Sequence, residues 1–148
     1  MKWNEKCILE LTHHNLFEST EHRSRFVDLL SCYWESPFFS KGLCKCMYLA
    51  AWTDDTFNEF LDMLNSVVIE GAKSLRMMKE NADVMYNTYK GTGAEMYRIS
   101  SAFLSDAPYQ VPDFSLMDPD GAYIIRRALL ASRYIDDLPN PHDPLLST

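Results

Sequence analysis

The feature that most constrains this sequence is a run of apolar residues at helical spacing between positions 57 and 68. The apolar residues recur at intervals of three, four and seven, and the positions between them are polar. The apolar set is Phe57, Phe60, Leu61, Leu64, Val67 and Val68, and the polar set is Asn58, Glu59, Asp62 and Asn65. This pattern is typical of an amphipathic helix with one buried face. The rest of the chain must supply other apolar faces to cover it.

Similar spacing recurs along most of the chain and predicts six helices. Ser19 is a typical N-cap residue and Ser36-Pro37 is a stop, so a helix lies between them. Thr53 can cap the helix that contains the 57–68 pattern, and Asp118-Pro119 has the cap and first-turn proline that begin the last helix. We expect helices at about 20–35, 41–52, 54–70, 72–89, 94–105 and 119–138.

The length of the chain sets the number of domains. A globular chain of 148 residues buries roughly 70% of its extended surface, which is enough for one core but not for two. We expect one helical domain over 1–139 and a flexible tail over 140–148, because prolines end the last helix there. Only Cys7 to Leu11 resembles a strand. The expected fold class is therefore an all-α, single-domain bundle of about six helices, with room for a short N-terminal strand or hairpin.

The charge balance restricts the partners. With 14 Lys plus Arg against 21 Asp plus Glu, the formal net charge is -7. Nucleic acids and anionic membranes require a basic face on the protein, so we expect neither as a direct partner. The polar start, and the lack of an apolar run long enough to span a bilayer, predict a cytoplasmic protein. Its four cysteines are then expected to be reduced thiols, namely Cys7, Cys32, Cys44 and Cys46.

Histidines and cysteines are candidate chemical groups, but their spacing is unsuited to metal binding. Structural zinc sites use closely spaced pairs, and the one close pair here is Cys44-Lys45-Cys46. Two positions apart on a helix, these thiols point about 200° apart. We expect no metal and no cofactor, and buried or half-buried thiols instead. We expect His13 and His14 to cap or precede the helix after Ser19, and His22 to lie on its solvent face.

Two groups of acidic residues form the candidate binding surface. One group lies in the first turns of the helix after Thr53, and the other lines the connection before the last helix. They are Asp54, Asp55, Glu59 and Asp62, and Asp106, Asp113, Asp118 and Asp120. Such groups are usually solvated faces, but they also select a basic protein partner and speed its association. Tyr109 and Phe114 lie in the same connection, where we expect them to pin it and to supply aromatic contact area.

The segment from Leu16 to Phe26 carries a further pattern. It reads Leu-Phe-Glu-Ser-Thr-Glu-His-Arg-Ser-Arg-Phe and continues into a helical pattern to about Trp52. This part of the chain resembles the opening of a family of small uncharacterised proteins carried by conjugative and phage-like elements of Gram-positive bacteria. Those proteins have a similar Phe-x-Ser-x-Glu-His-x-x-Arg-Phe pattern. The resemblance implies a setting in a mobile element, and it assigns no catalytic residue.

Such elements carry small acidic helical proteins chiefly to manage host defence or their own transfer. We therefore expect a non-catalytic protein that binds a nucleic-acid-handling host protein with a basic surface. Its most concrete form is an anti-CRISPR inhibitor of an effector nuclease, because carboxylate and phosphate present similar geometry to arginine. One alternative is a small hydrolase or nucleotide-modifying enzyme that uses His13, His14 or His22. The other is a component of the element's own transfer or regulatory complex.

Overall fold

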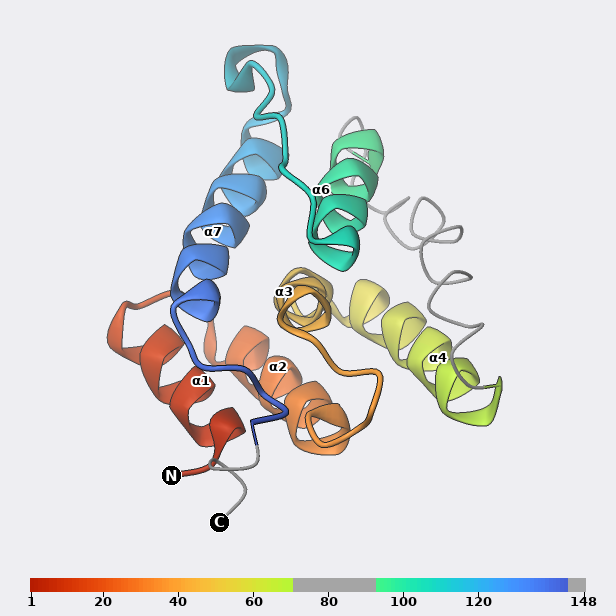
Figure 1. Ribbon diagram of the computed structural model, residues 1–148. Coiled ribbons are helices and arrows are strands. Elements are labelled where there is room, and N and C mark those ends of the chain that lie inside the picture. The colour runs from red at the N-terminus through yellow and green to blue at the C-terminus, as the bar shows by residue number, and fades with distance from the viewer. Residues whose placement is uncertain (71–92, 144–148) are drawn as a thin grey trace.

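The computed structural model describes residues 1–70 and 93–143, and in these residues it contains six α-helices, one short 3-10 helix and no strand. The α-helices are α1 (Trp3–His13), α2 (Thr20–Tyr33), α3 (Lys41–Ala50), α4 (Asp54–Glu70), α6 (Gly93–Ser105) and α7 (Pro119–Asp136), and the 3-10 helix η1 spans Phe114–Leu116. Figure 1 shows the helices gathered around α3. The expected all-α bundle is confirmed. The helix expected over 72–89 lies outside the described residues.

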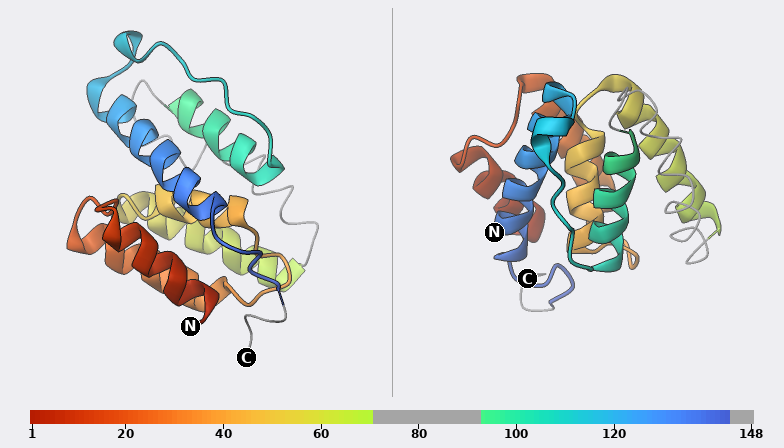
Figure 2. Two further views of the ribbon diagram at one scale, coloured as in Figure 1. Left: turned by 60° about the vertical axis from the view of Figure 1, so that its left-hand side comes forward. Right: turned by 90° about the horizontal axis from the view of Figure 1, so that it is seen from above.

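Helix α3 is the centre of the bundle. Every residue from Leu43 to Ala50 is buried, and α3 packs against α2, α4, α6 and α7. A helix in such a position must be apolar on nearly all sides, and α3 meets this condition except at Lys45. Gly42 allows α6 to approach closely, because a Cβ atom there would lie 2.0 Å from the Phe103 carbonyl oxygen. Figure 2 shows α3 and α6 side by side as a result.

The N-terminal segment is helical, which corrects the expectation of a strand at Cys7 to Leu11. Trp3, Cys7 and Leu11 are all fully buried and lie four residues apart, so they share one face of α1. Leu9 is 56% exposed, so the neighbouring apolar residues of this segment belong to two different faces of the helix. Because this segment is helical, the described residues contain no N-terminal hairpin either.

The expected helix starts are confirmed. Ser19 accepts a hydrogen bond from the His22 amide at 3.0 Å at the start of α2. Thr53 accepts the Thr56 amide at 3.2 Å at the start of α4. Asp118 caps α7, whose first residue is a proline. Helices α2 and α3 each end two residues before the expected position, which is the usual uncertainty of a helix end.

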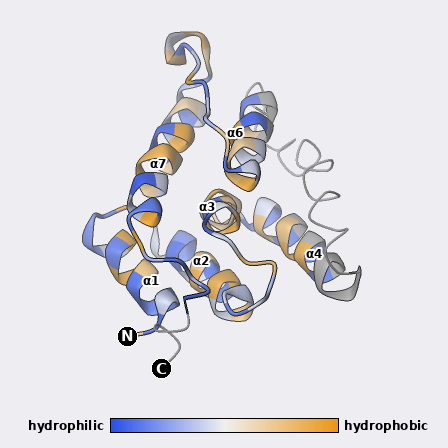
Figure 3. Ribbon diagram, in the orientation of Figure 1, coloured by the Kyte–Doolittle hydropathy of each residue, from blue (hydrophilic) through white to orange (hydrophobic). Residues whose placement is uncertain are grey.

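The amphipathic pattern of α4 buries the expected face. Its buried or half-buried residues include Phe57, Phe60, Leu61 and Leu64, while Asn58, Asp62 and Asn65 are exposed. Figure 3 shows the same change from apolar to polar around α4 and α7. None of the helices in the described ranges is long and apolar enough to cross a membrane.

The first residues of the expected tail pack against the bundle. The Trp3 indole donates a hydrogen bond to the Pro139 carbonyl oxygen at 2.7 Å, and Pro141 is buried. A ring nitrogen of His142 lies 2.5 Å from the Phe39 carbonyl oxygen. We call residues 139–142 the C-terminal strap. It joins α1 to the loop before α3, where the rings of Trp3 and Phe39 also meet edge to face with centroids 5.4 Å apart. Flexibility of the tail beyond the strap stays a prediction.

Candidate functional site

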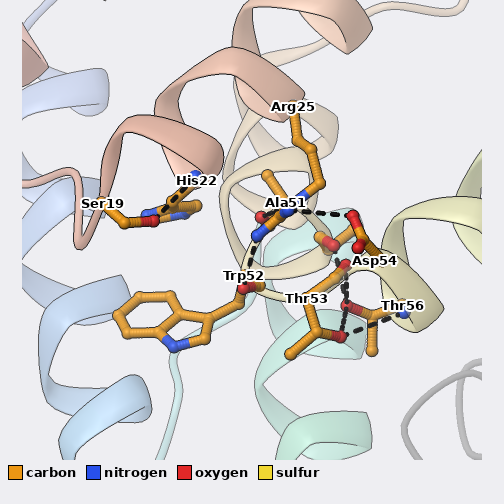
Figure 4. A network of polar contacts seen from close by, with 9 residues as sticks. Ser19, His22, Arg25, Ala51, Trp52, Thr53, Asp54 and Thr56 are labelled. Atoms are coloured by element: carbon orange, nitrogen blue, oxygen red, sulfur yellow. Dashed lines mark hydrogen bonds and ion pairs between the residues drawn. The ribbon is translucent and has the colours of Figure 1, made fainter.

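Arg25 forms a polar network at the point where α2, α3 and α4 meet (Figure 4). The network includes Asp54, which is one of the predicted acidic residues. Arg25 donates hydrogen bonds to the carbonyl oxygens of Ala51 and Trp52 at 2.7 and 2.9 Å. It also donates to Asp54 Oδ1 at 2.9 Å. The guanidinium thereby caps the C-terminus of α3 and ties it to the first turn of α4. Asp54 has a structural partner, although its side chain is 84% exposed.

The acidic group predicted after Thr53, namely Asp54, Asp55, Glu59 and Asp62, is spread along α4. Asp54 and Asp55 lie in the first turn, as expected, where the helix dipole favours negative charge. Asp55 and Asp62 are exposed. The side chain of Glu59 lies outside the part of the chain that the structure describes. Among the described residues of α4, Asp54 and Asp55 therefore lie in the first turn, and Asp62 lies about two turns further along the helix.

His22 is buried, which corrects the expectation that it lies on a solvent face. Its Nδ1 accepts the Glu18 amide at 3.0 Å, so the ring proton is on Nε2, which donates to the Tyr48 carbonyl oxygen at 2.9 Å. The ring also packs against the rings of Tyr48 and Trp52, each at 4.7 Å between centroids. Burial lowers the pKa of His22 to about 4, against the raising effect of the Tyr48 hydrogen bond. Both ring nitrogens are thus used inside the fold.

His13 and His14 lie at the end of α1 and precede α2, as expected. His13 is exposed. His14 stacks on the Tyr134 ring, with centroids 3.8 Å apart, and its Nε2 lies 3.1 Å from Glu10 Oε1. These contacts come from α1 and α7, whereas those of His22 come from the residues before α2, from α3 and from the residues just after α3. In the described residues, the three histidines therefore do not form one catalytic group.

The four cysteines are free thiols, and three of them are buried. Cys7 and Cys44 face each other with 3.7 Å between their sulfur atoms, and Cys46 Sγ lies 3.6 Å from the Ser100 carbonyl oxygen. Burial raises the pKa of the Cys44 and Cys46 thiols. Cys32 is exposed, which corrects the expectation of a half-buried thiol. Among the described residues, no three side chains of the types that bind metals are gathered to hold an ion.

The connection between α6 and α7 is held by contacts along its length. Asp106 follows α6 with a positive φ of 52°, a conformation that aspartate tolerates better than most residues. The Tyr109 hydroxyl donates to Glu95 at 2.7 Å, and the Arg126 guanidinium lies 4.7 Å from the centre of the Phe114 ring. Both aromatic residues are half-buried against the core. The prediction that they pin the connection is confirmed.

The middle of this connection extends beyond the ends of α6 and α7 (Figure 1). It presents two apolar side chains to solvent, Leu116 at 85% and Val111 at 54% exposure. Three exposed aspartates belong to the same segment, namely Asp113, Asp118 and Asp120. We call residues 111–120 the acidic tip. It therefore combines two exposed apolar side chains with three exposed carboxylates within ten residues of the chain.

Two of the tip aspartates also shape the backbone. Asp113 Oδ1 accepts the amide and the hydroxyl of Ser115 at 3.0 and 2.7 Å, and these bonds hold the pKa of the Asp113 carboxyl below its usual range. Asp118 accepts the Gly121 amide at 3.2 Å and so caps α7. A carboxylate has about four acceptor positions, so each of these groups keeps capacity for a partner's cation.

A cavity of about 350 Å³ lies beside the first residues of the connection. Its walls come from α3, α6, α7 and residues 106–109, and its polar lining residues are Lys45, Asp106, Ser132 and Asp136. Lys45 is almost fully buried, with Nζ 2.7 Å from Asp136 Oδ1 and 5.4 Å from the centre of the Phe103 ring. The charge of the buried Lys45 is therefore compensated by a carboxylate at the surface, since the Asp136 side chain is 55% exposed.

Sequence reasoning missed the two exposed apolar residues of the acidic tip and the cavity. Val111 and Leu116 lie in a segment without helical or strand periodicity, so no pattern indicated whether they are buried. The cavity joins residues from positions 45 to 136, and only the packing of three helices brings them together. Comparison with protein-family models, curated proteins and solved structures found no match.

Proposed function

We propose that this protein binds another protein through the acidic tip and regulates it without catalysis. The observation that carries this proposal is the exposure of Leu116 and Val111 at a projecting segment that also bears Asp113, Asp118 and Asp120. Large exposed apolar side chains within a polar rim are typical of protein-binding surfaces. A partner with a shallow apolar groove and a basic border fits this tip.

The acidic tip is favoured over the acidic group on α4 because its charges are less used inside the fold. Asp54 on α4 is paired with Arg25. Asp113 and Asp118 bond to uncharged amide and hydroxyl groups, which leaves their negative charge uncompensated. Uncompensated charge attracts a basic partner from a distance and raises the association rate. The aromatic residues that pin the connection then act as the support of the binding segment.

The partner class that we propose is a nucleic-acid-handling protein of a host that carries a mobile element. Its most specific form is a CRISPR effector nuclease, which makes this protein an anti-CRISPR inhibitor. Such nucleases hold nucleic acid with arginines, to which carboxylates offer a bidentate geometry similar to that of phosphate. The net charge of -7 and the resemblance of residues 16–52 to mobile-element proteins support this class. A component of the element's own transfer complex would use the same surface.

The test compares two matched variants of the whole chain. The tip variant carries D113N, L116S and D120N, and the α4 variant carries D55N and D62N. Each protein and the wild type are used to capture binding proteins from a Gram-positive lysate. The captured protein is then purified and titrated against all three proteins at about 50 and about 300 mM salt, a range over which exposed charges become screened.

We expect the tip variant to lose at least about tenfold in affinity, because it removes an apolar anchor and two charges. The α4 variant should keep its affinity, and wild-type binding should weaken as salt rises without vanishing. An affinity that is unchanged in the tip variant, or insensitive to salt, contradicts the proposal. A purified effector nuclease that cleaves its target equally fast with and without excess protein contradicts the anti-CRISPR form.

The enzyme alternative has less support from the geometry. A general base must reach its nucleophile through a free ring nitrogen, and both nitrogens of His22 are hydrogen-bonded to backbone groups. Replacing His13 and His14 by alanine separates the two functions. An enzyme that uses either residue would lose its effect, whereas a stoichiometric binding protein would keep it.

A further inference from the structure

We infer that the cavity beside Lys45 receives one arginine side chain of the partner, an inference that rests on the function proposed above. The cavity has a volume of about 350 Å³, which is within the range of sites for small ligands and sufficient for one side chain. Residues 106–109 form one of its walls. Since the same connection continues into the acidic tip, a partner that lies along the connection reaches both.

The charges around the cavity favour a cation. Lys45 is the single cation among the described lining residues, and Asp136 compensates it at 2.7 Å. Asp106 is exposed, and within the described residues its carboxylate has neither a hydrogen bond nor an ion pair. Helix α6 ends at Ser105 beside this carboxylate, so the negative end of its dipole adds to the charge. The end of α7 contributes less, because Lys41 already caps it at 2.9 Å.

The positions of the Lys45 and Asp106 charges determine how a partner's cation would enter the cavity that already contains Lys45. Lys45 is buried at 8% side-chain exposure, whereas Asp106 is exposed. A cationic group that arrives from solvent therefore meets Asp106 before it approaches the Lys45 ammonium. The ion pair joins the buried Lys45 to Asp136, whose side chain is 55% exposed, and Asp106 adds a carboxylate without a partner among the described residues at the rim of the cavity.

The walls of the cavity favour a guanidinium over other cations. Its apolar lining includes Phe103, Pro108, Tyr109 and Leu129. A guanidinium is planar and weakly hydrated and stacks on aromatic rings, whereas an ammonium is compact and strongly hydrated. Arginine can also form two parallel hydrogen bonds to one carboxylate such as Asp106.

The experiment titrates the whole chain with N-acetylarginine methylamide and follows the backbone amide signals by NMR. Two probes of similar size are the controls. The citrulline derivative keeps the shape and removes the charge, and the lysine derivative keeps the charge and removes the planar fork. We expect the arginine probe to shift the amides of residues 103–109 with a dissociation constant of about 1 mM or more, and each control to bind at least about fivefold more weakly.

Three variants locate the binding. D106N removes the charge at the rim while asparagine tolerates the positive φ at this position, so we expect about fivefold weaker binding of the arginine probe. A107L places a larger side chain in the wall and should abolish binding. D28N removes an exposed charge on α2 that does not line the cavity and is not part of the acidic tip, and it should leave probe binding unchanged.

The inference is overturned if the arginine probe causes no shifts at the cavity, or if all three probes bind equally. It is also overturned if D106N binds the arginine probe as tightly as wild type, or if D28N weakens binding as much as D106N does. The titration needs no partner, so its failure leaves the proposed function standing. The proposed function fails separately, if the tip variant binds the captured partner as tightly as wild type.

Discussion

The junction of α2, α3 and α4 and the acidic tip both combine acidic and apolar residues, yet they are built in opposite ways. At the junction, Arg25 on α2 donates hydrogen bonds to two carbonyl oxygens at the C-terminal end of α3. Both ring nitrogens of His22 are also hydrogen-bonded to backbone groups. At the tip, Asp113 bonds only two residues ahead, and Leu116 is 85% exposed. The junction holds three helices together, whereas the tip stabilises its own turn. The partner of a carboxylate, and not its place in an acidic cluster, decides whether it is available for binding.

Replacing Arg25 by alanine is the strongest way to break the junction. The carbonyl oxygens of Ala51 and Trp52 lose their charged donor, and each such bond contributes about 1.5–3 kcal/mol, so the free energy of unfolding should fall by about 3 kcal/mol. Denaturant unfolding followed by circular dichroism measures the change. Arg23→Ala removes an exposed arginine from the same helix and should stay within about 0.5 kcal/mol of wild type. A similar result for both variants would show that Arg25 does not hold the junction.

Acid should weaken the junction through His22. Its pKa is about 4 in the folded protein against 6.5 in the unfolded chain, so the unfolded chain binds a proton first as the pH falls. The His22 contribution is therefore fully present above about pH 7, is lost between pH 6.5 and about 4, and amounts to about 3 kcal/mol. Denaturant midpoints measured at successive pH values give the curve.

A matched variant isolates this titration from that of the carboxylates. His22→Gln keeps a donor and an acceptor but does not titrate, so its stability should fall less than that of wild type over the same interval. His13→Ala removes an exposed histidine and should reproduce the wild-type slope. Parallel curves for wild type and His22→Gln would contradict the assignment of the pH dependence to the buried ring.

Sequence patterns predicted the fold where the apolar face is continuous and the caps are local. Phe60 and Leu64 are buried as their spacing requires, and Asp118 caps the helix that begins with a proline. The patterns failed where the deciding partner is distant in the chain. His22 is polar, and its position predicts a solvent-exposed side chain. It is buried because the Tyr48 carbonyl oxygen and the Trp52 ring, at the C-terminal end of α3, contact its ring. No local pattern contains that information.

The candidate site was predictable only in part. The sequence places Asp113, Asp118 and Asp120 in one connection, and the structure keeps them exposed there. It does not indicate that Asp54 is paired with an arginine 29 residues earlier, which distinguishes the two acidic groups. It also leaves open whether Leu116 is a core anchor or an exposed contact, because a single apolar residue in a loop has no periodicity.

Neutralising Asp54 should change the free energy of unfolding only slightly. This variant separates the contribution of the ion pair from that of the hydrogen bonds between Arg25 and the two carbonyl oxygens. The Asp54 side chain is 84% exposed, so Asp54→Asn should lower the free energy of unfolding by about 0.5 kcal/mol. The difference from wild type should shrink as salt rises. Denaturant unfolding at low and high salt checks both points. A loss as large as that of Arg25→Ala would make the ion pair, and not the carbonyl bonds, the basis of the junction.

The smallest expected change in stability is that of Leu116→Ser at the acidic tip. Because this side chain is 85% exposed, the free energy of unfolding should stay within about 0.5 kcal/mol of wild type, while partner affinity falls. Leu43→Ala, which truncates a fully buried leucine of α3, is the opposite control and should cost about 3 kcal/mol. If Leu116→Ser destabilises the protein by more than about 1 kcal/mol, its side chain belongs to the core and the tip is not a free surface.

The hydrogen bond between the Trp3 indole and the Pro139 carbonyl oxygen joins residues that are 136 positions apart. Translation adds about 5–20 residues per second, so the acceptor of Trp3 is made roughly 7 to 27 seconds after Trp3 itself. During that interval α1 has only 11 residues, too few to be stable as an isolated helix in water. Helix α2 and Phe39 are made earlier and can pack against α1 before Pro139 is made. The hydrogen bond to Pro139 is therefore the last of these contacts to become possible, and a pause in translation before codon 139 would delay it.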